Sequence, residues 1–204
     1  EKFNKYKRII KEYSEYFQKQ LFEKKNSFAL NYLKERKLSE EVIKKFQLGY
    51  VPVNNFLDEL SKKYSIEDIK STGLYYFVEK NQKYIDRFKN RIIFPILNLS
   101  GDIIAFGGRI INNNKLAKYI NSPETEFFKK GRQLFNLNLA KDERSNSKEV
   151  IIVEGYMDVI SLYSRGVKNV ISNSGTALTE SQINLIWKFF INPIICLDAD
   201  KSGQ

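Results

Sequence analysis

The sequence predicts an α/β protein in two parts: a basic part of mixed helices and strands, followed by a parallel sheet with helices on its faces. Three observations predict this. Apolar residues recur every three or four positions near the N-terminus, which is typical of an amphipathic helix. Two apolar runs rich in β-branched residues are joined by a turn sequence in the middle of the chain. From residue 149 onward, short apolar runs alternate with helical patterns, as in a βαβαβ arrangement.

The first part begins with three helical patterns. Residues 3–22 place aromatic and aliphatic side chains on one helix face, and residues 27–37 predict a second helix. Ser39 precedes two glutamates, as expected for a helix N-cap with acidic residues in the first turn, so it predicts a third helix. The next predicted elements are a short strand and two short helices (residues 48–52, 54–64 and 65–73).

A β-hairpin is predicted over residues 91–113, because two apolar runs flank the turn sequence NLSGD. A turn-rich segment follows it. Residues 140–149 are polar and charged, which is typical of a link between domains. We therefore expect two domains, residues 1–140 and residues 141–204.

The second part predicts the order strand, helix, strand, helix, strand. EVIIVEG is expected to be a buried strand and YMDVISLYSRG a helix. VKNVISNSG predicts a second strand, TESQINLIWKFF a helix capped by Thr179, and NPIICLDADKSG a third strand that runs into a loop. Strands joined in this way form a parallel sheet. We expect Trp187, Phe189 and Phe190 of the second helix to lie in the core.

The composition narrows the possible chemistry. Of the 204 residues, 42% are hydrophobic and 14% aromatic, as expected for a folded protein. The chain has no histidine and one cysteine, Cys196, so an internal disulfide, a cysteine-based zinc site and histidine-dependent catalysis are excluded. No apolar run is long enough to span a membrane. The first residues have neither a methionine nor a signal-peptide pattern, so we expect a fragment of a longer protein.

Positive charge is concentrated in the first part. The net charge is +10, yet residues 149–204 carry 4 basic and 6 acidic side chains. A basic N-terminal part and an acidic C-terminal part predict a surface that binds a polyanion and a site that binds a cation. A genome rich in A and T, which favours lysine codons, explains part of the lysine excess.

Four carboxylates are expected at one edge of the parallel sheet, since such sheets bind ligands at the carboxyl ends of their strands. Glu154 ends the first strand, Asp198 and Asp200 end the third, and Asp158 lies one helical turn after Glu154. Clustered carboxylates repel one another and favour a bound cation, and oxygen ligands suit Mg²⁺ or Mn²⁺. Asp158 is equally well explained as an acid in the first turn of a helix.

The sequence FGGR also indicates a ligand. We interpret the two glycines before Arg109 as backbone that leaves space for a ligand. Single lysines such as Lys118 are more simply explained as part of a solvated surface, and Tyr119, beside an apolar strand, as a core residue.

The acidic pattern resembles the Toprim domain: a strand with EGxxD, a second strand with Ser and Gly after it, and a third strand with DxD. Primases, topoisomerases, RecR-like repair proteins and OLD-type nucleases share this domain. VEGYMDVISLYSRGV, NSGTALT and CLDADKSG resemble bacterial (DnaG-type) primases in particular. YLKERKLSEEVIKKFQLGYVP, DRFKNRIIFPI, GDIIAFGGRII and KYINSPETEFFKKGRQLFNL resemble, in this order, the basic subdomain that precedes the primase Toprim domain.

The resemblance implies an RNA polymerase that makes short RNA primers on single-stranded DNA by two-metal nucleotidyl transfer. It implies that Glu154, Asp198 and Asp200 hold two Mg²⁺ or Mn²⁺ ions, and that Asp158 is a fourth catalytic acid. The family's template- and nucleotide-binding positions fall on eight residues of this chain: Arg36, Arg87, Arg91, Arg109, Lys118, Tyr119, Asn121 and Lys130.

The resemblance also implies the partners. These are a single-stranded DNA template, ribonucleoside triphosphates and the RNA primer, with no membrane. A zinc-binding N-terminal domain and a C-terminal domain that binds the replicative helicase are expected outside this chain. The implied location is the bacterial cytoplasm, at replication forks on the nucleoid.

Three departures from the family pattern stand out. Ala199 replaces the middle glycine of the family's DGD motif, which reads DAD in this chain. Lys37 replaces the glycine that commonly follows the arginine at position 36. The chain also ends within the Toprim domain. We therefore expect a truncated, Rossmann-like Toprim sheet and weak or no activity from the fragment alone. Two alternatives stay open: a nucleic-acid-binding module with an inactive metal site, and a Toprim nuclease.

Overall fold

The predicted α/β class is confirmed, in two units. The computed structural model describes residues 1–53, 56–111, 116–175 and 177–198. Unit 1 consists of Glu1–Ile96 and Ile103–Phe128, and unit 2 of Leu97–Asp102 and Lys129–Gln204. The domain division at residue 140 stays a prediction. Among the described residues, no helix combines the length and the apolar character that crossing a membrane requires.

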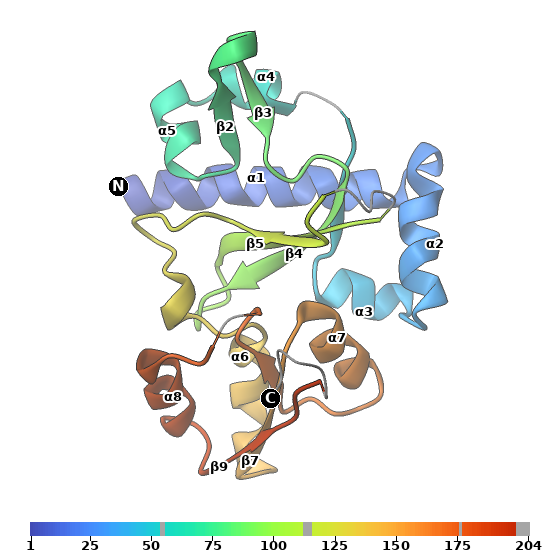
Figure 1. Cartoon of the computed structure of the whole chain (residues 1–204), viewed down its shortest axis with the longest axis vertical. Coiled ribbons are helices and arrows are strands. Elements are labelled where there is room, and N and C mark those ends of the chain that lie inside the picture. Colours follow the sequence, from blue (N-terminus) through green and yellow to red (C-terminus); the bar gives the residue numbers. More distant parts are fainter. Residues whose placement is uncertain (54–55, 112–115, 176, 199–204) are drawn as a thin grey trace. The chain divides into compact units, whose positions relative to one another are not determined.

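A long amphipathic helix, α1 (Lys2–Phe22), organises unit 1. Its apolar side chains recur on one face, as predicted, and that face is buried. Tyr13 and Phe17 are fully buried, with ring centroids 4.6 Å apart in an edge-to-face contact. Figure 1 shows α1 running across unit 1, where it packs on β1 (Gly49–Val51) and β5 (Ile103–Ile110). The core of unit 1 therefore lies between this helix and a sheet.

Two shorter helices follow α1 and the 3₁₀ turn Lys24–Asn26: α2 (Ser27–Glu35) and α3 (Glu40–Lys45). The predicted N-cap is confirmed, because Ser39 Oγ accepts a hydrogen bond from the backbone N of Val42 at 3.3 Å. This bond satisfies one of the free N–H groups at the start of α3.

The C-terminus of α2 ends in a left-handed residue. Lys37 has a φ of 63°. Its backbone N donates to Lys34 O, and the backbone N of Leu38 donates to Leu33 O, which together form a Schellman motif. Position 37 is where the family pattern has glycine, so lysine keeps the motif at the cost of a conformation that strains its Cβ.

We expect Lys37→Gly to raise the free energy of unfolding by about 0.5–1 kcal/mol, because glycine adopts this φ without the steric penalty. Urea unfolding followed by circular dichroism measures the change. Lys45→Gly is the control, since Lys45 has a helical conformation at the end of α3 and its replacement should destabilise by about 1 kcal/mol. Destabilisation by both variants would contradict the prediction.

The sheet of unit 1 has the strand order β1-β4-β5-β6, with β4 (Arg91–Leu97) and β6 (Tyr119–Asn121). The predicted hairpin is confirmed as β4 and β5. In the turn between them, Asn98 Oδ1 accepts hydrogen bonds from the backbone N of Ser100 and of Asp102. This side chain replaces the backbone partners that a tight turn lacks.

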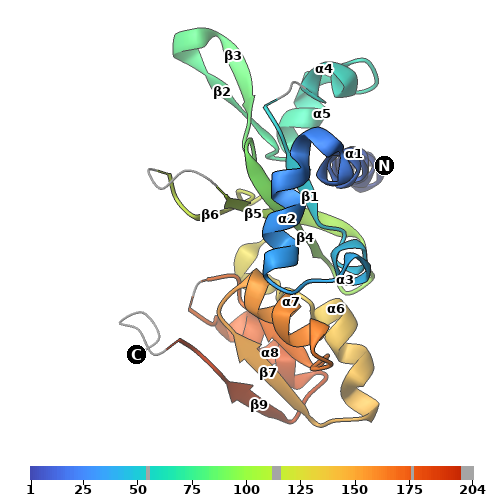
Figure 2. The ribbon, with the colours of Figure 1, turned by 90° about the vertical axis from the view of Figure 1, so that its right-hand side faces the viewer.

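The sequence analysis missed a second hairpin in unit 1. Helices α4 (Phe56–Ser61) and α5 (Ile66–Ser71) lie where they were predicted, although residues 54–55 fall outside the described residues. After them, β2 (Tyr75–Val78) pairs with the antiparallel β3 (Lys83–Asp86) through the 3₁₀ turn Glu79–Asn81. Figure 2 shows this hairpin projecting from unit 1. Its strands have only four residues each, and β3 combines polar and apolar residues, so the pair lacks the two long apolar runs that indicated the first hairpin.

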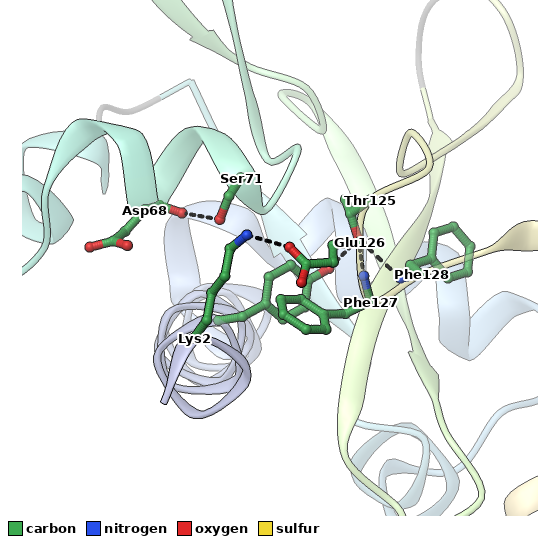
Figure 3. Close-up of polar contacts among 8 residues, drawn as sticks. Lys2, Asp68, Ser71, Thr125, Glu126, Phe127 and Phe128 are labelled. Atoms are coloured by element: carbon green, nitrogen blue, oxygen red, sulfur yellow. Dashed lines mark hydrogen bonds and ion pairs between the residues drawn. The ribbon is translucent and has the colours of Figure 1, made fainter.

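The segment after β6 is fastened to the start of α1. Thr125 Oγ1 lies 3.2 Å from the hydroxyl of Tyr6 and accepts a hydrogen bond from the backbone N of Phe127. The Phe127 ring also contacts Tyr6, with centroids 4.8 Å apart. Figure 3 shows the bonds of Thr125 and the ion pair between Lys2 and Glu126. The segment is therefore anchored by apolar and polar contacts.

Unit 2 contains the predicted parallel sheet. β7 (Glu149–Val153) is the central strand, and β8 (Val170–Ser172) and β9 (Asn192–Ile195) pair with it in parallel. The strands are joined by α7 (Tyr156–Ser164) and α8 (Glu180–Trp187). In the strand order β8-β7-β9, the connection from β7 to β8 and the connection from β8 to β9 run in opposite directions across the sheet. Right-handed connections therefore put α7 and α8 on opposite faces of the sheet.

Short helices precede β7 in the turn-rich region: two 3₁₀ helices, Lys130–Arg132 and Lys141–Ser145, and α6 (Leu137–Ala140). Leu137 and Phe190 pack with apolar residues of β7 and β8 in the core of unit 2. The predicted cap of α8 is confirmed, because Thr179 Oγ1 accepts from the backbone N of Gln182. These contacts hold α6 and α8 on one side of the sheet.

The prediction that Trp187 lies in the core is wrong. Phe190 is buried and Phe189 packs partly against the core, but Trp187 is 61% exposed. Ile186 takes the buried position in the last turn of α8, and the next residue is turned by about 100° around the helix. Trp187 therefore faces away from the core.

Candidate active site and nucleic-acid interface

Glu154 and Asp198 meet at the carboxyl edge of the sheet in unit 2. Glu154 directly follows β7, and its Oε1 accepts a hydrogen bond from the backbone N of Asp198 at 2.8 Å. Ser172, at the end of β8, donates from Oγ to the backbone O of Glu154 at 2.8 Å. The ends of β7 and β8 and the segment after β9 thus converge on one residue, as parallel strands permit. Asp200 lies outside the described residues.

A pocket of about 270 Å³ opens beside these acids. Its lining includes Glu154, Asp158 and Asp198, together with Arg165 and Cys196. Glu154 is half-buried, and Asp158 and Asp198 are exposed. Three carboxylates against one cation make the lining negative, so a cation is electrostatically favoured there.

Asp158 also caps the helix that leaves the strand. Its Oδ2 accepts a hydrogen bond from the backbone N of Gly155 at 3.0 Å, and it lies in the first turn of α7. A carboxylate in this position stabilises the positive end of the helix dipole. This contact is the one expected from the capping interpretation, and the catalytic role of Asp158 stays a prediction.

The donor chemistry of the described acids fits a hard divalent cation, because every ligand available from them is an oxygen. Within the described ranges, the cysteine, aspartate and glutamate side chains form no group of three or more that could hold a metal ion. Glu154 and Asp198 supply two adjacent carboxylates. The third predicted ligand, Asp200, is the member of the set that the structure does not describe.

Three of the predicted nucleic-acid-binding residues meet in unit 1. Arg109 on β5 donates from Nη1 to the hydroxyl of Tyr119 on the neighbouring β6, at 2.6 Å. Its guanidinium carbon lies 5.1 Å from the ring centroids of Tyr119 and Tyr32. The guanidinium of Arg36 covers the ring of Tyr32 at 3.6 Å. Cation–π contacts thus hold both guanidinium groups in defined positions.

Sequence reasoning missed Tyr32, which links Arg36 to Arg109. It lies four residues before Arg36 on α2, the spacing that puts two side chains on the same helix face. This spacing was the available signal. Arg36 also donates from Nη1 to the backbone O of Tyr32, so the arginine is fixed by its own helix.

The interpretation of the glycines before Arg109 is wrong for Gly108. A Cβ at Gly108 would lie 2.5 Å from Cδ1 of Phe88 and 3.2 Å from Cδ of Arg91. Phe88 is fully buried, so its ring cannot move aside. Glycine is therefore required by core packing against β5, and a ligand is not needed to explain it.

Arg87 and Arg91 are both held by backbone carbonyls. Arg91 is 5% exposed, and its Nη1 donates to Ala117 O at 2.9 Å and Lys118 O at 3.2 Å. Burial lowers its pKa from the ordinary value. Arg87 donates from Nε to Gly73 O at 2.8 Å and is half-buried. Arg91 thus ties β4 to the segment before β6, and Arg87 keeps part of its guanidinium accessible.

The remaining three predicted residues do not join this group. Lys118, directly before β6, is exposed, and Asn121 lies at the end of β6, opposite Gly107 of β5. Lys130 belongs to unit 2, where its backbone O accepts a hydrogen bond from Nε2 of Gln182. Their roles in binding nucleic acid stay predictions.

The fold and the acidic site define the class as an α/β protein that combines a basic mixed unit with a Toprim-type unit. Comparison with protein-family models agrees. Residues 16–141 match the N-terminal domain of the DNA primase catalytic core, and residues 148–204 match the Toprim domain. The chain belongs to the DNA primase catalytic-core family.

Curated relatives and solved structures are consistent with this family. The chain is 38% identical over 196 residues to DNA primase from Legionella pneumophila and 39% identical over 209 residues to that from Clostridium acetobutylicum. These alignments cover 96% and 100% of this chain and 34% of each relative. The chain thus spans about a third of the length of these relatives.

Two solved structures have a closely similar fold. A DnaG primase catalytic domain bound to single-stranded DNA matches with a TM-score of 0.90 and 31% identity, over 99% of this chain and 63% of that one. The zinc-binding and RNA polymerase domains of Aquifex aeolicus primase match with a TM-score of 0.89 and 35% identity, over 100% and 50%. Toprim domains and primases generally use divalent metal ions.

Proposed function

We propose that this chain is part of the catalytic core of a DNA-directed RNA polymerase that makes short RNA primers on single-stranded DNA for replication. The observation that carries the proposal is the hydrogen bond from the backbone N of Asp198 to Glu154 Oε1, 2.8 Å long. It joins two acids of the Toprim pattern that are far apart in sequence. Family membership and sequence identity along nearly the whole chain support the same reaction.

Glu154, Asp198 and Asp200 are the proposed ligands of Mg²⁺ or Mn²⁺, with two ions expected. When bound, such ions neutralise charge on the nucleotide phosphates and lower the pKa of the attacking hydroxyl. The chain's own contribution is to fix the acids, since Glu154 is held by the end of β8 and by the segment after β9. Zinc is expected only in a further N-terminal domain.

The basic residues of unit 1 are proposed to hold phosphates of the template and the nucleotide. Arg36 and Arg109 are pre-positioned by Tyr32 and Tyr119, which reduces the entropy lost when a phosphate binds. Arginine offers two parallel donors to a phosphate, whereas Lys118 acts as a point charge. Arg87 and Arg91 are proposed for the same role, Tyr119 for stacking on a base, and Asn121 and, from unit 2, Lys130 as further residues that bind nucleic acid or nucleotide.

The proposed partners follow from the reaction. They are the single-stranded template, ribonucleoside triphosphates and the RNA primer, and, through a C-terminal domain, the replicative helicase. A related catalytic domain has been solved bound to single-stranded DNA, which supports the first of these. The proposed location is the cytoplasm, at replication forks. We also propose that the two functional domains divide at residue 140.

The test is incubation of the full-length gene product with a single-stranded template, ribonucleoside triphosphates and Mg²⁺ or Mn²⁺. We expect short RNA products that require both the template and the metal. Shortened template in the absence of nucleotides would instead identify a Toprim nuclease. Template binding with neither product would identify a binding module, and either result would overturn the proposal.

A further inference from the structure

The basic segment before α6 is fastened to the start of α8 by two side chains. This segment contains the 3₁₀ turn Lys130–Arg132, and with Lys129 it carries three cations in four residues. We call residues 129–132 the basic turn. A 3₁₀ turn of three residues has little stability of its own, and its end leaves backbone carbonyls without partners inside the turn. Contacts from another segment are therefore needed to hold it.

Gln182 supplies two of these contacts. It is fully buried, and its Nε2 donates hydrogen bonds to Lys130 O at 3.2 Å and to Gln133 O at 2.8 Å. Its Oε1 accepts a hydrogen bond from the backbone N of Thr179 at 3.0 Å. Both N–H groups of the side-chain amide and its oxygen are therefore engaged, as a buried amide requires.

Thr179 supplies a third contact. Its Oγ1 donates a hydrogen bond to Gly131 O at 2.5 Å and accepts one from the backbone N of Gln182 at 3.1 Å. A Cβ at Gly131 would lie 3.2 Å from Cγ2 of Thr179, so the turn lies directly against this side chain. Thr179 and Gln182 thus cap α8 and, with the same two side chains, satisfy the carbonyls of residues 130, 131 and 133.

The residue type at position 182 indicates that the cap is only part of its task. A capping box works with glutamate or glutamine at the third helical position, because the cap needs only an acceptor oxygen there. Glutamate would in addition be stabilised by the positive end of the helix dipole. Only glutamine can donate hydrogen bonds to both Lys130 O and Gln133 O. Glutamine at this buried position is therefore explained by the basic turn, since the cap alone does not require it.

The basic turn lies beyond the carboxyl edge of the parallel sheet. Phe135 forms an antiparallel bridge with Ser172, the last residue of β8, through Phe135 N to Ser172 O at 2.8 Å and Ser172 N to Phe135 O at 3.2 Å. In an antiparallel pairing, the residues before Phe135 run past the end of β8, and the three residues back to Arg132 span at most about 11 Å. Ser172 Oγ also donates to Glu154 O, so the basic turn lies at the edge that holds the acidic site.

We propose that Thr179 and Gln182 are positioning residues that hold the basic turn beside the acidic site, where its cations bind the phosphates of the nucleotide. Lys129 and Arg132 are exposed, and Lys130 is half-buried. The proposal rests on the proposed function for the nucleotide and adds the side chains that fix the turn. A cation held in place before binding loses less entropy when a phosphate arrives. Loss of either positioning side chain should therefore weaken nucleotide binding although no charge is removed.

The first measurement is fluorescence anisotropy of a labelled ATP analogue titrated with the full-length gene product in the presence of Mg²⁺. Gln182→Met keeps the side-chain volume and removes both donors, and Thr179→Val replaces the hydroxyl by a methyl group. Each should raise Kd roughly three- to thirtyfold, whereas Thr179→Ser, which keeps the hydroxyl, should stay within twofold of the wild type. In primer synthesis KM should rise by the same factor and kcat should change less than twofold, because uniform binding affects KM alone.

Two controls separate positioning from capping and from general stability. Gln182→Glu keeps the acceptor of the capping box but loses the two donors, so it should raise Kd as Gln182→Met does. Ile186→Val removes one methyl group from a buried residue one turn further along α8, and it should change Kd less than twofold. Thermal unfolding of every variant verifies the fold, and the Thr179 variants test the proposal by themselves if those of Gln182 unfold.

A double-mutant cycle tests whether the two residues act through the basic turn. In a protein that carries Lys130→Gln and Arg132→Gln, Gln182→Met should raise Kd by less than a further twofold, since little charge is left to position. Failure of the wild type to bind ATP, a normal Kd for Gln182→Met or Gln182→Glu, an equal loss for Ile186→Val, or additive losses in the cycle would overturn the proposal. Absence of primer synthesis by the wild type would overturn the proposed function, whereas the binding measurements would still decide whether Gln182 positions the turn.

Discussion

Glu154→Gln is expected to lower primer synthesis by the full-length gene product at least about a hundredfold, while single-stranded DNA binding changes less than twofold. Glutamine keeps the size of the side chain, and its Oε1 can still accept the hydrogen bond that Glu154 accepts from the backbone N of Asp198. The local fold should therefore survive. What is lost is one negative charge at a proposed cation ligand, and metal-ion stabilisation of charge is worth several kcal/mol in transition states.

The same strand offers a control for this substitution. Glu149 begins β7 and Glu154 follows its end, so Glu149→Gln makes the same chemical change at the opposite edge of the sheet. Ligands of parallel sheets bind at the carboxyl edge, and Glu149→Gln should leave primer yield unchanged. The measurement is the yield of labelled RNA on a single-stranded template with Mg²⁺ or Mn²⁺. Normal yield from Glu154→Gln, or equal losses from both variants, would contradict the assignment of Glu154.

The sequence was most informative for helices that have a long apolar pattern or a recognisable N-cap residue. The buried face of α1 follows from its apolar spacing, and Ser39 and Thr179 were identifiable as N-caps because their side chains act on the next few residues. The β2–β3 hairpin could not be found in the same way. Its strands have four residues each, and they are stabilised by contacts with the rest of unit 1 that local sequence does not reveal.

In the candidate site, too, some contacts could be predicted from the sequence and others could not. The proximity of Glu154 and Asp198 could be predicted from the sequence, because the strand ends of a parallel sheet share an edge. In the structure, the backbone N of Asp198 donates a hydrogen bond to Glu154 Oε1. Gly108 could not be understood from sequence, since its neighbour Phe88 lies on another segment. Tyr32 was missed for a related reason: its contact with Arg109 joins α2 to β5. Contacts between distant segments depend on packing, which periodicity does not encode.

Asp86 makes the stability of unit 1 depend on pH. Its carboxyl group lies at the end of β3 and accepts hydrogen bonds from Tyr13 and from the backbone N of Phe88. Burial raises its pKa from 3.8 to about 7, although these hydrogen bonds act in the opposite direction. The folded chain therefore retains a proton on Asp86 in a pH range where the unfolded chain has lost it.

The direction of the effect follows from proton linkage. Between about pH 4 and pH 7 the folded state binds more protons than the unfolded state, so the free energy of unfolding falls as pH rises. A shift from 3.8 to about 7 sets an upper limit of roughly 4 kcal/mol for this fall. The contribution is fully present below pH 4 and is lost as pH rises through 7.

Asp86→Asn is expected to remove most of this dependence. The amide oxygen can still accept from Tyr13 and Phe88, but it carries no charge at any pH, so the variant should be more stable than the wild type at pH 8. Urea unfolding followed by circular dichroism at pH 4, 6 and 8 measures the slopes. Asp142→Asn is the control, because Asp142 is exposed and its loss should leave the wild-type slope intact. Parallel curves for the wild type and Asp86→Asn would show that the ionisation of Asp86 does not govern the stability of unit 1.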